Sequence, residues 1–456
     1  MGYRTFSVFF LACWCSGVAA APVSVLPDHP FGDQRYSLDE RFSLDLLTGL
    51  EPVGGPGAED VWLVFAPRLS YAASGFLLSL GNPLRASLAE RKPVPGMFDH
   101  WQDWLAPIRE VAYDSAAFHV GLGVLRDVTL GSGTLVRNYS SALLREETRV
   151  GFRLWTDPRR LVEVQAFSAS PTEPGPLGTM VSVKPFLKTA STPTPLQKMS
   201  FRGSSVAHLD APARYHQSST GMSILAEDGW GYELAERRDL FFYGGGLTLP
   251  LFEDALYHVH FLADLNAVGT DGTGFHYGAE GSATVPGNPI DQRLKARLEL
   301  RWLRGEYLPA YLDRWYDLTS REISGQGEAR TKVQVLDDLP GAARRGYLLE
   351  LGYEVREYLG LELEYEHQDT VHGQGWLGTL WARPRSRLRL ELTVGAPPLV
   401  RPGRDGTLVL GAGRYDFSDC WFAQGGMSSR FAFRHFDGEG RYSHLLGALL
   451  AVGAKL

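Results

Sequence analysis

The sequence predicts an all-β fold, a transmembrane antiparallel β-barrel of about 16 strands, with about 14 or about 18 as alternatives because single-chain bacterial barrels have even numbers. Three observations predict it. Apolar and charged residues alternate over stretches long enough to cross a membrane as tilted strands. After the first 20 residues no stretch of 18 or more apolar residues occurs, so no α-helical span is expected. The 51 glycines and 12% aromatic residues accompany many turn signals, which suits a barrel better than a helical protein.

The alternation is clearest in the segment 291–302. Its apolar face consists of Leu294, Ala296, Leu298, Leu300 and Trp302, and each residue between two of these is charged. Only a β-strand turns a period of two into two faces. Strands of soluble sandwiches usually run about 5–6 residues and tilted membrane strands about 9–11, so the length favours a membrane strand with its charges in a wet lumen. The alternative is a soluble, exported β-rich protein, which would have to bury these leucines against a second sheet.

The chain opens with a pattern typical of a secretory signal peptide. Arg4 is followed by an apolar run over 6–15 and by small residues up to Ala20, which predicts a signal peptide at 1–20 cleaved after Ala20. The apolar run is shorter than the roughly 20 residues of a membrane-spanning helix, which disfavours an anchor. A lipoprotein site at Cys13 is the second alternative.

Two further segments divide the mature chain. Residues 21–58 are rich in Pro, Gly and Asp, which predicts an irregular periplasmic leader with a short strand at 41–47, and residues 59–456 are assigned to the barrel. Within 98–108, Phe98, Trp101 and Trp104 stand at helical spacing. They predict a short amphipathic helix that either plugs the lumen or lies at an interface.

Charge and cysteine content exclude several functions. The formal net charge is −7, and removal of Arg4 with the signal peptide makes it −8, which argues against binding to nucleic acid. No CxxC motif and no CxxCH haem motif occur, so no cofactor is expected. His258 and His260 share one face of a strand, but without a clear third ligand we interpret them as lumen histidines rather than as a metal site.

An enzymatic function is not expected. His367, Asp369 and His372 fall in one predicted outer loop, but their spacing is not diagnostic of a catalytic constellation.

Several later segments repeat the alternation of 291–302 and place charged residues on one face. The side chains expected to line the pore are Arg293, Lys295, Arg297, Glu299, Arg301, His258, His260, Asp264, Glu350, Glu354, Glu362, Glu364, Glu366, Arg387, Arg389, Glu391, Arg430 and Arg434. They form acidic and basic strips, and rows of charge along a pore tune its selectivity for ions and solutes. The alternative is that cross-strand ion pairs fill and rigidify the lumen.

One strand is missing from the predicted topology between residues 305 and 331. Either 307–320 contains an unrecognised strand, or 305–330 is a long loop that crosses the lumen.

The exported chain, its alternating strands, its short turns opposite longer loops and its final strand at the C-terminus resemble Gram-negative outer-membrane β-barrel proteins of the porin-like type. It departs from their pattern at Leu456, where such proteins commonly end in an aromatic residue. The resemblance implies an outer-membrane location among lipid and lipopolysaccharide, biogenesis by the barrel-assembly machinery, and a channel for small hydrophilic solutes. The alternative function is a plugged barrel that anchors or sheathes a periplasmic or surface protein complex.

Overall fold

The computed structural model describes residues 41–53, 60–81, 84–88, 92–93, 105, 107–125, 127–141, 150–158, 161–171, 173–187, 195–217, 233–270, 272–286, 292–314, 316, 330–355, 358–369, 373–385, 387–396, 407–418, 420–436 and 439–455. Within these ranges, 22 strands form a single sheet. They are β1 (Arg41–Val53), β2 (Asp60–Ala73), β3 (Phe76–Leu80), β4 (Leu84–Ser87), β5 (Lys92–Pro93), β6 (Ile108–Ser115), β7 (Phe118–Val124), β9 (Val150–Thr156), β10 (Val162–Ser168), β11 (Pro176–Val183), β12 (Ser200–Tyr215), β13 (Leu234–Glu253), β14 (Tyr257–Val268), β15 (Gly272–Val285), β16 (Gln292–Arg304), β18 (Arg344–Val355), β19 (Leu359–Gln368), β20 (Gln374–Arg385), β21 (Leu388–Ala396), β22 (Leu408–Asp416), β23 (Trp421–Phe436) and β24 (Glu439–Lys455).

In the described part of the chain, four small elements lie outside this sheet. The strands β8 (Val136–Arg137) and β17 (Leu312–Asp313) pair in parallel with each other. The 3-10 helix η2 covers Pro195–Lys198, and the helix α2 covers Lys332–Asp337. Thr331 caps α2, since its hydroxyl accepts from the backbone N–H of Gln334. No helix in the described ranges is both long and apolar enough to cross a membrane.

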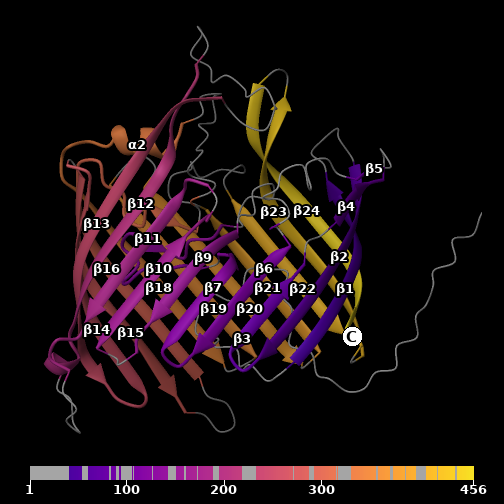
Figure 1. The fold of residues 1–456 in the computed structure, drawn as a ribbon, viewed down its shortest axis with the longest axis horizontal. Helices are drawn as coiled ribbons and strands as arrows, with labels where there is room; N and C mark the ends of the chain where they lie inside the picture. The colour runs from indigo at the N-terminus through magenta and orange to yellow at the C-terminus, as the bar shows by residue number, and fades with distance from the viewer. Residues whose placement is uncertain are drawn as a thin grey trace, which may run out of the picture.

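The strands pair antiparallel in a continuous series, and the first and last of them lie side by side (Figure 1). Residues 45–50 of β1 pair in register with residues 450–455 of β24. The short strand expected at 41–47 is part of β1, which continues to Val53, so the sheet begins inside the segment expected to be an irregular leader. The Pro- and Gly-rich composition was misleading there, because β1 finds backbone partners on both sides, in β2 and in β24.

Two other expectations are not settled. The predicted helix at 98–108 lies mostly outside the described residues, and its last position, Ile108, begins β6. The expected strand number of about 16 is not confirmed. The described sheet has 22 strands, and some of these are as short as the two residues of β5.

The polarity of the strands is the reverse of that in a soluble domain. In β16, the Leu298 and Trp302 side chains are 49% and 45% exposed, whereas Glu299 and Arg301 are 4% and 2% exposed. The prediction of an aliphatic outer face and a charged inner face is thus confirmed for this strand. A soluble sandwich required Leu294, Leu298 and Leu300 to be buried, and all three are exposed. Below, the inner face is the side of the sheet that carries Glu299 and Arg301.

Two loops pack against the inner face and build an apolar core there. Tyr139 of the loop 125–141 and Tyr311 of the loop 305–314 are fully buried with residues of β10–β16. The Tyr311 ring lies 4.6 Å from the ring of Phe242 on β13, and the Tyr139 ring lies 5.8 Å from Phe167 on β10. The described part of 305–330 therefore agrees with a loop that enters the lumen. Only its two-residue β17 is a strand, and it pairs with the other loop.

Candidate functional site

The charged side chains of three neighbouring strands meet in rows across the inner face. Arg297 of β16 stands in register with Glu350 of β18, which stands in register with Glu364 of β19. The next row toward the short turn between β18 and β19 consists of Lys295, Gly352 and Glu362. Because alternate residues of a strand face the same side, successive rows are about 7 Å apart. The rows place acidic and basic groups opposite each other on one wall.

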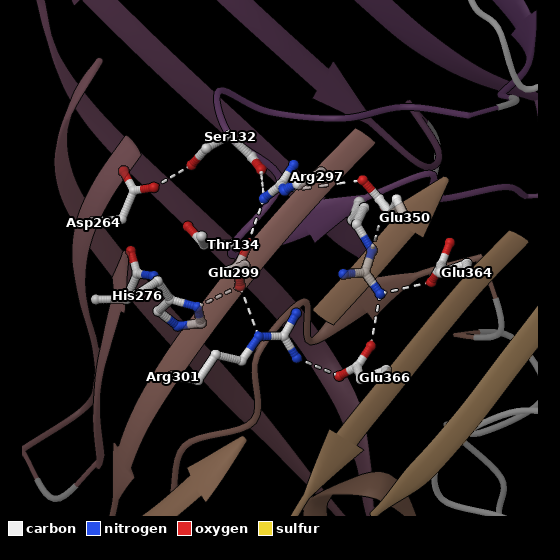
Figure 2. A network of polar contacts seen from close by, with 12 residues as sticks. Ser132, Thr134, Asp264, His276, Arg297, Glu299, Arg301, Glu350, Glu364 and Glu366 are labelled. Carbon is white, nitrogen blue, oxygen red and sulfur yellow. Dashed lines mark hydrogen bonds and ion pairs between the residues drawn. The ribbon is translucent and has the colours of Figure 1, made fainter. Parts of the chain in front are cut away.

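The buried centre of this wall is the carboxylate of Glu299 (Figure 2). It accepts a hydrogen bond of 2.7 Å from Arg301 Nε and a further one from Arg297 Nη2. His276 Nδ1 lies 2.8 Å from the same carboxylate, and Arg301 Nη1 donates to Glu366 at 2.6 Å. Each buried charge thus has a partner of opposite sign, which is the condition under which charges are tolerated away from water.

The loop 125–141 is fixed to this wall through Arg137. Its Nη2 donates to Glu364 at 2.8 Å and to Glu366 at 2.6 Å, and Glu350 lies 4.0 Å from its Nε. Burial by itself would lower the pKa of the Arg137 guanidinium, but Glu364, Glu366 and Glu350 more than offset this and hold that pKa well above its ordinary value. Arg137 therefore stays charged and joins the loop to β18 and β19.

The same loop is also bound to the wall at Ser132 (Figure 2). The Ser132 hydroxyl donates to Asp264 of β14, and its carbonyl oxygen accepts from Arg297 at 2.5 Å. Asp264 also pairs with Arg202 of β12, at 3.0 Å. Charged residues of four strands, β14, β16, β18 and β19, therefore hold this one loop against the inner face, and Arg202 of β12 supports Asp264.

The second loop, 305–314, is anchored by Tyr307. The Tyr307 hydroxyl accepts from Asn266 at 3.0 Å and lies 2.9 Å from His276 Nε2. Burial raises the pKa of Tyr307 above its ordinary value, so the phenol stays neutral and able to donate. A Cβ on Gly274 would lie 2.2 Å from the Tyr307 ring, so only glycine leaves room for this loop.

Between the first loop and the strands lies a cavity of about 400 Å³. Seven of the predicted pore-lining residues line it, namely His258, His260, Lys295, Arg297, Glu350, Glu362 and Glu364. Three more charged residues line it, namely Arg137 and Arg314, one from each loop, and Glu280 of β15. None of the three was predicted from the sequence, and the two arginines do not belong to an alternating stretch. The only signal near Arg137 was the glycine-punctuated run before it, which has no period of two.

The remaining predicted residues have other positions. Asp264, Glu299, Arg301 and Glu366 belong to the buried network and do not line the cavity. Arg293 and Glu354 form the next row beyond Lys295. Arg387, Arg389 and Glu391 lie at or within β21, on another part of the wall. Arg430 and Arg434 belong to β23, but their side chains are outside the described part of the chain. Their role as pore-lining residues stays a prediction.

His258 and His260 each lie near a carboxylate of a neighbouring strand. His260 Nδ1 lies 3.9 Å from Glu280, and His258 Nδ1 lies 4.0 Å from Glu253. Over the ranges that the structure describes, no three His, Cys, Asp or Glu side chains are grouped so that they could hold a metal ion. His367 pairs with the exposed Asp369 at 3.5 Å, and His372 lies outside the described residues.

No family model and no curated protein matches the sequence. Solved structures similar to the chain come from Pseudomonas aeruginosa. The chain is 11% identical to OccK9 (OpdG), with a TM-score of 0.34 and coverage of 91% of this chain and 97% of that one. The outer membrane protein opdK is 9% identical, with a TM-score of 0.33 and coverage of 91% and 99%. OccK2 (OpdF), solved in complex with glucuronate, is 10% identical, with a TM-score of 0.32 and coverage of 92% and 98%. At such identities and TM-scores, no function is transferred from these proteins to this chain.

Proposed function

We propose that this chain is a bacterial outer-membrane β-barrel that acts as a channel for small hydrophilic solutes. The observation that carries the proposal is a sheet with an exposed aliphatic face on one side and a charged cavity of about 400 Å³ on the other. In water this arrangement would be unfavourable, whereas in a bilayer it satisfies both faces. The pairing of β1 with β24 supports closure of the sheet, which removes the free strand edges that lipid does not tolerate.

Aromatic side chains on the outer face support the membrane location. Phe275 and Trp302 are exposed and stack with Tyr277 at ring distances of 5.8 and 5.1 Å, near the loop end of β15 and β16. Exposed aromatic residues also stand beside the short turns at the opposite end of the strands, such as Tyr257 and Tyr358. Two aromatic girdles around an aliphatic band are typical of outer-membrane barrels. The surroundings of the band would be lipid and lipopolysaccharide, reached after export and insertion by the barrel-assembly machinery.

The cavity favours an open channel rather than a barrel whose lumen is completely filled. The two loops fill part of the inner space with an apolar core, but the cavity beside them is lined by charged side chains of both signs. A polar, hydrated passage beside a narrowing loop can pass small solutes and select among them by charge.

Single-channel recording tests this function. We expect the detergent-refolded mature chain, shown to be folded by heat-modifiable migration on a gel, to open steady conductances in a planar bilayer. Arg297→Glu should shift the reversal potential in a salt gradient toward cation selectivity, because it replaces a cation on the cavity wall by an anion. The exposed Arg345 provides the matched control, and Arg345→Glu should leave the potential unchanged.

A folded barrel that stays silent in this experiment would contradict the channel. It would favour a plugged barrel that anchors or sheathes a periplasmic or surface protein, and the next measurement would be stoichiometric co-purification of that partner.

A further inference from the structure

In one row of the cavity wall, a basic and an acidic side chain are separated by a glycine. Lys295 and Glu362 stand on either side of Gly352 in one row, and all three line the cavity. Neighbouring strands are about 4.8 Å apart, so the backbones of Lys295 and Glu362 are separated by roughly 10 Å. Because Gly352 has no side chain, the space between the two charged residues is open to a solute.

Two residues of opposite charge line this cavity without a direct ion-pair partner among the described residues. Other charged lining groups are paired, as Arg137 is with Glu364 at 2.8 Å and Arg297 with Glu350 at 3.9 Å. Glu362 is in no such pair, and the opposite charges that act on it are those of Arg314 and Lys295, which line the same cavity. A carboxyl group and a guanidinium therefore face the same space without touching each other.

Buried donors at the edge of the cavity also lack acceptors. Within the described residues, Arg314 Nε and Arg297 Nε are buried and have no hydrogen-bond partner, and both residues line the cavity. A buried donor without a partner is unfavourable, so an acceptor supplied by a solute would be stabilised there. These donors belong to basic residues, so they support an anion site independently of Glu362.

We propose that this cavity binds a small zwitterion, with its ammonium group at Glu362 and its oxyanion at Arg314 and the neighbouring donors. A solute that carries only an anionic group would be repelled by Glu362. A solute that carries only a cationic group would be repelled by Arg314 and Lys295. Like-charge contacts of this kind discriminate against the wrong partner. A cavity of about 400 Å³ holds a solute of a few heavy atoms together with water. The inference deepens the proposed channel function by naming the class of solute that passes.

Four small solutes of similar size separate the cases. L-serine carries both charges, L-lactate carries the anion, ethanolamine carries the cation and glycerol carries neither. Binding is measured by saturation-transfer NMR on the folded chain in detergent, which does not require conduction. We expect serine to bind at least tenfold more tightly than each of the other three.

Two variants reverse the preference in opposite directions. Glu362→Gln removes the carboxylate and leaves the positive charges of Arg314 and Lys295. Lactate should therefore bind to this variant about tenfold more tightly than serine does. Arg314→Gln removes the guanidinium and leaves the negative charge of Glu362. Ethanolamine should therefore bind to this variant about tenfold more tightly than serine does. Each fold-change corresponds to one charge-assisted contact. The matched controls Glu173→Gln and Arg345→Gln remove the same charges at exposed positions outside the cavity and should preserve the preference for serine.

The outcomes distinguish this inference from the channel itself. Conductance without preferential binding of serine overturns the zwitterion site and keeps the channel. Binding of serine without conductance supports the site and overturns the channel. Serine binding that is insensitive to both Glu362→Gln and Arg314→Gln also overturns the site, because the charges named here would then not form it.

Discussion

Arg137 is the residue that joins the loop 125–141 to the strand wall. Its side chain is 5% exposed and bonds both Glu364 and Glu366. Arg137→Met would leave the partly buried Glu364 without its cation and Glu366 with Arg301 alone, and breaking a buried pair costs up to about 3–5 kcal/mol. We expect the loop to leave the wall, so that single-channel conductance rises and the urea midpoint of unfolding falls. Arg345→Met removes an exposed guanidinium as the control, and equal conductance in both variants would show that Arg137 does not hold the loop.

At the scale of the element, the loop 305–314 depends on the absence of a side chain in β15. A Cβ on Gly274 would lie 2.2 Å from the Tyr307 ring, whereas a Cβ on Gly203 of β12 has nothing within 4 Å. Gly274→Val should displace Tyr307 from Asn266 and His276 and cost about 1–3 kcal/mol, as overpacking does. We expect trypsin to cut the folded protein after Arg314 faster than in the native chain. Gly203→Val is the matched control, and equal cleavage of the two variants would contradict the anchoring role of Tyr307.

The strands and their polarity were predictable from the sequence, but the loops were not. The alternation in 291–302 assigned Glu299 and Arg301 to the inner face, because a period of two can be satisfied only by a strand. Arg137 and Tyr307 reach the inner face from segments without any period, and their contacts join positions more than 20 residues apart. Such contacts depend on the tertiary arrangement of segments far apart in the sequence rather than on local pattern, so no local rule could place them. For the same reason the length of β1 was underestimated from the sequence, because one of its partners is the last strand of the chain.

At the scale of the whole molecule, the pairing of β1 with β24 decides whether the sheet is a barrel. Thr48 and Val452 are Cα partners across this seam, and both side chains are exposed. Opposed residues of antiparallel strands lie about 4.5–5.5 Å apart at Cα, which is within the range that a disulfide can bridge.

In a Cys420→Ser background, we expect Thr48→Cys/Val452→Cys to cross-link on oxidation of the folded protein, giving a faster-migrating band on a boiled, non-reducing gel. The control pairs Thr48→Cys with Leu265→Cys on β14, a strand that does not pair with β1. A closed barrel cross-links the first pair and not the second, because only the seam brings position 48 beside its partner. Failure of the first pair in a folded, heat-modifiable protein would mean that the sheet is open at this seam, and an open sheet would expose in lipid the strand edges that closure is proposed to remove.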